Sequence, residues 1–142
     1  MKDLLTIILV AFGYFGYFVI PQTAMDKTFN LEIKFENIQK TDKPIYVALY
    51  QSEKEFNNKK IFKRYTVLPS KKTSLEIPDL PEGTYAILCF QDLNDNHHLD
   101  FNGYMPDEPW GLSNNITRMG PPTWTDAAFK LNRNLQLNIE LF

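Results

Sequence analysis

The chain of 142 residues has little cysteine and little histidine, and both shortages exclude kinds of site. Cys89 is the only cysteine, so no disulfide can form within the chain, and it lies too far from the N-terminus to be a lipid-modified N-terminal cysteine. We expect Cys89 to be a small apolar core residue. His97 and His98 are neighbours that point in opposite directions in extended chain, so they cannot readily share one metal. Because no cysteine or third histidine completes a set, zinc is not expected.

Excess charge and catalytic motifs are also lacking. The formal net charge is −2, from 15 basic and 17 acidic residues, which gives no electrostatic reason to expect nucleic acid or an anionic membrane as a partner. The sequence has no nucleophile elbow, phosphate-binding loop or His-Glu-x-x-His motif, so we do not expect an enzyme. It shows no internal repeat, and no helical pattern long enough for a β-α-β unit.

The one long apolar run begins the chain. Lys2 precedes residues 4–20, which are almost wholly apolar, and no charged residue lies between Asp3 and Asp26. A basic start followed by such a run is typical of a secretory signal peptide, and its length is also close to that of a membrane-spanning helix. A buried core helix is the weaker alternative, because a core helix should have a polar face.

The domain organisation follows from this leader helix. Residues 1–24 are predicted to be a signal peptide or an uncleaved N-terminal membrane anchor, and residues 25–142 a single exported domain. Both alternatives place the domain outside the cytoplasm, in the periplasm, at the cell surface or secreted. A membrane contact is expected only through an uncleaved leader.

Alternation of apolar and polar residues dominates the rest of the chain. Such a period of two predicts strands with one buried face, and the predicted strands cover residues 29–35, 45–50, 61–68, 73–77, 84–91, 127–131 and 135–141. The strands 45–50 and 84–91 are apolar on both faces and are expected in the middle of a sheet. About seven strands with closely spaced turns predict an all-β fold, a Greek-key β-sandwich of immunoglobulin-like or transthyretin-like type. An open barrel is the second choice.

Three connections between the strands carry their own signals. Ser52 and Glu55 have the spacing of a capping box, which predicts a short helix over residues 52–57. Two prolines and a glycine within residues 78–83 predict a connection that separates two strands. Residues 132–134 read as a hairpin turn between the last two strands.

The loop after residue 91 carries the distinctive chemistry. Oxygen-bearing side chains occupy the first, third, fifth and ninth positions of a cation-loop pattern; these are Asp92, Asn94, Asn96 and Asp100. His98 stands at the seventh position, where the ligand is a backbone carbonyl. Ca²⁺ takes six to eight oxygens from a loop curled so that alternate residues point inward, so the spacing predicts a calcium site. The alternative is a turn in which Asn and Asp side chains cap the backbone.

Two positions depart from the calcium-loop pattern. His97 stands where glycine normally makes the sharp turn, and Gly103 stands where a bidentate glutamate normally closes the site. We expect Asp107 or Glu108 to fold back as the missing acidic ligand. The second part of the loop is rich in aromatic residues and proline, and its aromatic side chains either bind a ligand or pack over one end of the domain. The residues expected to bind a ligand or to pack beside the loop are Trp110, Asn114, Asn115 and Trp124.

Several segments together resemble domain-of-unknown-function family 2141, an exported bacterial family. They are residues 83–86, 92–96, 99–100, Pro106, 108–115 and 122–129, and the resemblance runs from about Phe29 to the C-terminus. The resemblance implies an exported β-sandwich with no established activity. The loop of that family usually carries glycine near its third Asn or Asp residue, where this chain has Asp95 and His97.

These observations leave three functional hypotheses. The first is an exported, non-catalytic binding or structural module whose Asp/Asn-rich loop binds Ca²⁺, with a cell-surface glycan or a protein as partner. The second is a hydrolase acting on glycans or peptides, with Asp92 or Asp100 as the acid or base. The third is a carbohydrate-binding module that uses Trp110 and Trp124.

Overall fold

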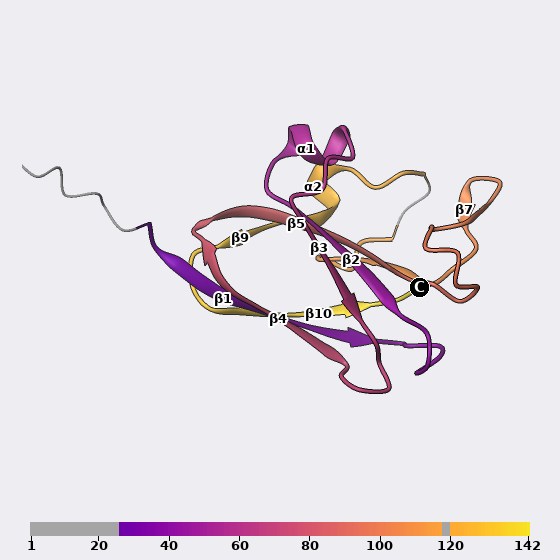
Figure 1. The fold of residues 1–142 in the computed structure, drawn as a ribbon. Coiled ribbons are helices and arrows are strands. Elements are labelled where there is room, and N and C mark those ends of the chain that lie inside the picture. Colours follow the sequence, from indigo (N-terminus) through magenta and orange to yellow (C-terminus); the bar gives the residue numbers. More distant parts are fainter. Residues whose placement is uncertain (1–25, 118–119) are drawn as a thin grey trace, which may run out of the picture.

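Strands dominate the part of the chain that the computed structural model describes, residues 26–117 and 120–142. The elements are β1 (Thr28–Glu36), β2 (Ile45–Tyr50), α1 (Glu53–Asn57), β3 (Lys63–Val67), β4 (Ser74–Pro81), β5 (Gly83–Gln91), β6 (Phe101–Asn102), β7 (Met105–Pro106), β8 (Trp110–Leu112), α2 (Trp124–Ala127), β9 (Ala128–Leu131) and β10 (Leu135–Glu140). The predicted all-β class is confirmed (Figure 1). The leader predicted over residues 1–24 lies outside the described residues, and none of the described helices is long and apolar enough to span a membrane.

Three strands form sheet A, in the order β10-β1-β4. β1 lies in the middle, parallel to β10 and antiparallel to β4. Its alternating sequence buries Leu31, Ile33 and Phe35 and leaves Lys34 exposed, as expected of a strand with one face on the core. Because Leu31 pairs with Leu135, strands from opposite ends of the domain lie side by side.

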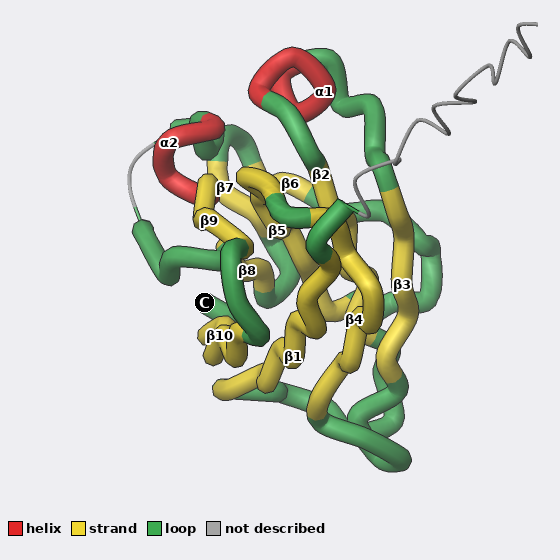
Figure 2. The backbone as a smooth tube through the Cα atoms, turned by 90° about the vertical axis from the view of Figure 1, so that its left-hand side faces the viewer, coloured by secondary structure: helices red, strands yellow, loops and turns green. Residues whose placement is uncertain are grey.

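Sheet B has the order β3-β2-β5, and β5 has two successive partners on its far side. β9 pairs with the beginning of β5, and β8 pairs with Leu88, Cys89 and Phe90 near its end. β2 and β5 therefore have neighbours on both sides, as their apolar sequences predict. The inner faces of both sheets share one core cluster, to which β1 contributes Ile33 and β5 contributes Ile87. Figure 2 shows β1 and β10 in one layer and β5, β8 and β9 in the other.

The predicted connection at residues 78–83 is much shorter than expected, because β4 continues through Pro78 to Pro81 and only Glu82 separates it from β5. β4 is an edge strand, and an edge tolerates proline because one row of its N–H groups has no partner in the sheet. The pairing with β1 shifts between Phe29 and Leu31, and Asp79 has φ +54° at this irregularity. The turn residues thus make a bulge within the strand.

The predicted hairpin at residues 132–134 is also wrong. β9 pairs with β5 in sheet B, whereas β10 pairs with β1 in sheet A. The turn carries the chain from one sheet to the other. An alternating pattern specifies that a segment is a strand, but it does not specify the partner of that strand.

A second apolar cluster covers part of the outer face of sheet B. α1 begins at the predicted N-cap, where the Ser52 hydroxyl accepts the Glu55 N–H at 3.3 Å. Phe56 of α1 is buried, and its ring lies 5.2 Å from that of Tyr50 and 6.0 Å from that of Trp124. α1 and α2 therefore cover part of this face.

Candidate functional site

The long loop after β5 starts from two buried polar residues, Gln91 and Asp92. The Gln91 amide nitrogen donates to the Lys40 carbonyl at 2.5 Å, and its oxygen accepts the Gln39 N–H at 2.9 Å. The Asp92 N–H donates to the Pro44 carbonyl at 3.0 Å. These bonds fasten the base of the loop to the turn before β2. Gln91 was not among the predicted site residues, although a polar residue at the end of an apolar strand was a signal.

The carboxylate of Asp92 holds the loop from inside. It is fully buried, and its two oxygens accept the N–H of Asn96 at 3.2 Å and that of His97 at 2.9 Å. The His97 Nδ1 atom lies 3.7 Å from the same carboxylate. A buried carboxylate is stabilised by such N–H dipoles, so Asp92 curls the backbone around itself.

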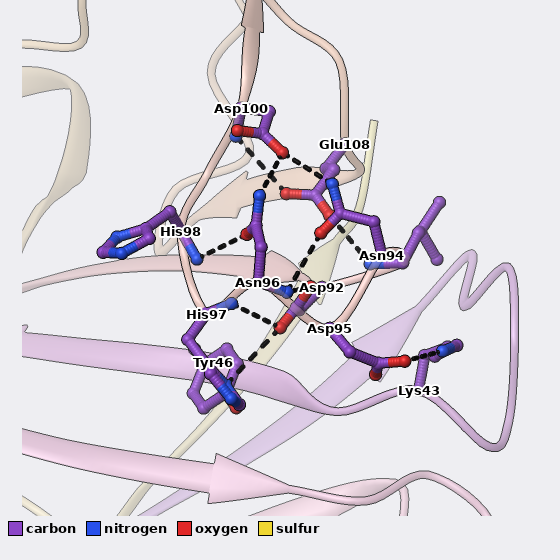
Figure 3. A network of polar contacts seen from close by, with 11 residues as sticks. Lys43, Tyr46, Asp92, Asn94, Asp95, Asn96, His97, His98, Asp100 and Glu108 are labelled. Atoms are coloured by element: carbon purple, nitrogen blue, oxygen red, sulfur yellow. Dashed lines mark hydrogen bonds and ion pairs between the residues drawn. The ribbon is translucent and has the colours of Figure 1, made fainter.

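Three predicted ligand side chains converge on the outer side of this curl (Figure 3). The amide nitrogens of Asn94 and Asn96 donate to the same Asp100 oxygen, Oδ2, at 2.7 and 2.6 Å. The Asn94 oxygen accepts the Asn96 N–H at 3.1 Å, and the Asn96 oxygen accepts the His98 N–H at 2.8 Å. The three side chains therefore converge on one point, and the two asparagines also cap the backbone of the loop.

Glu108 returns to the loop from beyond the β6-β7 hairpin. Its side chain is buried, and its oxygens accept the Leu93 N–H at 2.8 Å and the Asp100 N–H at 3.4 Å. The Asp107 N–H donates to the Asp100 carbonyl at 2.9 Å, which closes the hairpin, while the Asp107 side chain stays exposed. Glu108, rather than Asp107, is thus the acidic residue that folds back.

The backbone explains why glycine suits this loop. Asp95 and His97 have φ angles of +64° and +65°, in the left-handed region that favours glycine. Such a conformation costs a non-glycine residue about 1–2 kcal/mol. Both side chains offset this cost with contacts to strand β2 or the turn before it: Asp95 pairs with Lys43, and the His97 ring lies 2.5 Å from the Tyr46 hydroxyl. The hydrogen bond that Lys43 donates to the Asp95 carboxylate raises the pKa of Lys43.

In the described part of the chain, no three His, Cys, Asp or Glu side chains form a metal-binding group. Two of the converging residues, Asn94 and Asn96, are asparagines, whose amide oxygens are ligands for hard cations. The carboxylates of Asp92 and Glu108 are each engaged with two backbone N–H groups of the loop.

A groove lies beside the loop, over the part of sheet B that the helices leave uncovered. Its volume is about 1030 Å³. Tyr46, Phe90 and Trp110 pair across β2, β5 and β8 and form an aromatic row along its floor. His97, His98 and the β6-β7 hairpin form one wall, and the hairpin carries the exposed side chains Phe101, Tyr104 and Met105.

A comparison with protein families shows the family to which the chain belongs. The family described as "Uncharacterized protein conserved in bacteria (DUF2141)" matches residues 33–138. The chain belongs to the DUF2141 family. This confirms the resemblance seen in the sequence. No curated protein and no solved structure matches the chain.

Two asparagines within residues 108–115 join strands. The Asn114 amide donates to the Ala128 carbonyl at 2.9 Å. The Asn115 amide donates to the Asn138 carbonyl at 2.8 Å and accepts the Glu140 N–H at 2.9 Å. These amides therefore hold β9 and β10, and none of these bonds goes to the backbone of residues 92–100.

Two further residues within 108–115, Gly111 and Ser113, have structural roles that were not predicted from the sequence. The buried Ser113 hydroxyl donates to the Ala127 carbonyl and accepts the Ile87 N–H at 3.1 Å. A Cβ atom on Gly111 would lie 2.6 Å from the Glu140 carbonyl oxygen, so only glycine lets β8 approach β10 this closely. Both tryptophans pack against the second apolar cluster, but Trp110 also lines the groove, whereas the Trp124 ring packs on Phe56 of α1.

Proposed function

We propose that this DUF2141 domain is an exported, non-catalytic binding module whose loop from Asp92 to Asp100 binds Ca²⁺. The observation that carries the proposal is the convergence of Asn94 and Asn96 on one oxygen of Asp100. In this arrangement two amide N–H dipoles point at the carboxylate. A cation at the same centre would replace these dipoles with a full charge.

The chemistry of the loop supports a hard cation. A half turn of each amide about its last side-chain bond exchanges nitrogen for oxygen, so Asn94 and Asn96 would each supply an oxygen ligand. Asp100 and the His98 carbonyl supply further oxygens, as the spacing predicts. The carboxylates of Asp92 and Glu108 lie beneath and are buried, and a nearby divalent charge stabilises buried anions.

The arrangement of the sheets supports a transthyretin-like form of the predicted Greek-key sandwich. In an immunoglobulin domain the first strand pairs with the second, within a sheet of the first, second, fifth and fourth strands. Here β1 pairs with β4 and β10, and β2 pairs with β3 and β5. Export is proposed from the apolar run at residues 4–20.

The surroundings of Asp92 favour a binding role over a hydrolase. Both Asp92 oxygens accept backbone N–H groups, and the side chain is fully buried. A general acid or base must reach its substrate, and Asp92 could do so only if the loop opened. A sugar platform built from both tryptophans is disfavoured, because Trp110 lines the groove whereas Trp124 does not and packs on Phe56 of α1.

Calcium-dependent thermal stability tests the proposal. A ligand that binds only the folded state stabilises it by about 2.7 kcal/mol at a hundred times its dissociation constant. We expect Ca²⁺ to raise the melting temperature of the purified protein above that in a chelator. Asp100→Asn should abolish this shift.

The matched control is Asp107→Asn, which makes the same chemical change at an exposed carboxylate next to Glu108. This variant should keep the calcium shift. Equal melting temperatures of the wild type in Ca²⁺ and in chelator would show that the Asp/Asn residues only cap the turn. Equal shifts in both variants would exclude Asp100 as a ligand.

A further inference from the structure

The outer face of sheet B presents an apolar surface that the described chain covers only in part. Tyr50, Ala86 and Leu112 lie under the two helices, in the second apolar cluster. Ala48 and Leu88 pair with each other across β2 and β5, next to the aromatic row, and line the open groove. A sheet surface this apolar is normally covered by protein or by a ligand.

The charged residues of the groove all have one sign. Its lining includes Lys59 and Arg64, together with His97 and His98, and no Asp or Glu among the residues that the structure describes. Arg64 pairs with Ala48 across β3 and β2, so its cationic side chain stands at the end of the row that continues through Leu88. With the described residues, neither Lys59 nor Arg64 makes an ion pair. Their charge is therefore available to a ligand.

We propose that this groove binds an amphipathic organic anion, with its apolar body on the floor and its anionic group at Arg64. Ligand sites are mostly apolar clefts of about 300–1,000 Å³ with a few placed polar groups, and the groove of about 1030 Å³ has this character. The small side chain of Ala48 leaves depth between the aromatic row and the helix-covered cluster. The guanidinium group suits a carboxylate, sulfate or phosphate, which it can bind through two parallel hydrogen bonds.

This inference rests on the proposal that the domain is a binding module, but it does not require calcium. The experiment is a fluorescence titration of the purified full chain with 8-anilinonaphthalene-1-sulfonate, an aromatic sulfonate, in Ca²⁺ and in chelator. We expect saturable binding and its competition by dodecanoate. Dodecyltrimethylammonium, with the same chain length and the opposite charge, and a neutral oligosaccharide should compete at least tenfold less well.

Two variants place the ligand. Arg64→Gln should weaken binding of the sulfonate about three- to tenfold, whereas Arg133→Gln, the same change in the turn after β9, should leave it unaltered. Ala48→Phe fills the floor and should abolish saturable binding with the near-UV circular dichroism of a folded domain retained. Every variant keeps the apolar run at residues 4–20, so binding there would not distinguish them.

Four results would overturn the inference. They are equal affinities of the wild type and Arg64→Gln, undiminished binding by folded Ala48→Phe, better competition by the cationic chain, and displacement by the neutral oligosaccharide, which would make the groove a glycan site. If the calcium shift is absent but Arg64-dependent binding persists, the calcium proposal fails alone. If binding fails but the calcium shift remains, only the groove inference fails.

Discussion

Gly111 is the position where one added methyl group should disturb both sheets. β8 carries Gly111 between Cys89 of β5 and the end of β10, and Trp110 exchanges backbone hydrogen bonds with Phe142 at 2.9 and 3.3 Å. In Gly111→Ala the new Cβ atom would lie 2.6 Å from the Glu140 carbonyl oxygen and 2.7 Å from Cγ2 of Ile139. Backbone cannot move aside as a flexible side chain can, so β8 and β10 must separate.

Overpacking of this kind costs about 1–3 kcal/mol, and for a domain of this size we expect the melting temperature to fall by about 5–15 °C. Thermal unfolding followed by circular dichroism measures the change. Gly83→Ala is the matched control, because its Cβ atom would come no closer than 3.4 Å to the Tyr85 ring, at a position without positive φ. If Gly111→Ala melted within about a degree of the wild type and of Gly83→Ala, the close approach of β8 to β10 would not exist in solution.

Two further predictions concern Cys89 and Lys59. Burial raises the pKa of the Cys89 thiol from 9.0 to about 12, so its stabilising contribution is complete below pH 9 and is lost as the pH rises through 12. The change in pKa of about three corresponds to roughly 4 kcal/mol of unfolding free energy. Denaturant titrations should therefore show that the free energy of unfolding falls less between pH 8 and pH 11 in Cys89→Ala than in the wild type. Equal losses would contradict the burial of the thiol. Lys59 follows α1 with φ +55°, and its N–H donates to the Phe56 carbonyl, so it occupies a position normally taken by glycine. Lys59→Gly should therefore raise the free energy of unfolding by about 1 kcal/mol. A lower free energy of unfolding in this variant would refute the prediction.

Seven strands were predictable from the sequence, most from a period of two and the two central ones from apolar runs. The alternation in residues 29–35 gives β1, and the apolar stretches at 45–50 and 84–91 give two strands with neighbours on both sides. β8 escaped prediction because three residues are too few to show a period, and Gly111 within it reads as a break. Its position depends on contacts with β5 and β10, which are distant in sequence.

The candidate site was only partly predictable. The spacing of Asp92, Asn94, Asn96 and Asp100 indicated a curled loop, and the structure has one. The spacing could not show that Asp92 points under the loop whereas Asp100 faces the two asparagines. The groove was not foreseen at all, because its floor, its walls and Arg64 come from β2, β3, β5, β8 and the loop together.

The pairing of β1 with β10 has a consequence for how the protein reaches its folded state. Leu31 and Leu135 are partners, so the central strand of sheet A obtains its second neighbour only from a segment about a hundred residues further along the chain. Pairing between such distant segments slows folding. A product truncated before Leu135 would leave β1 with an unpaired edge, which is a template for aggregation. Sheet A can therefore be completed only after β10 has been synthesised.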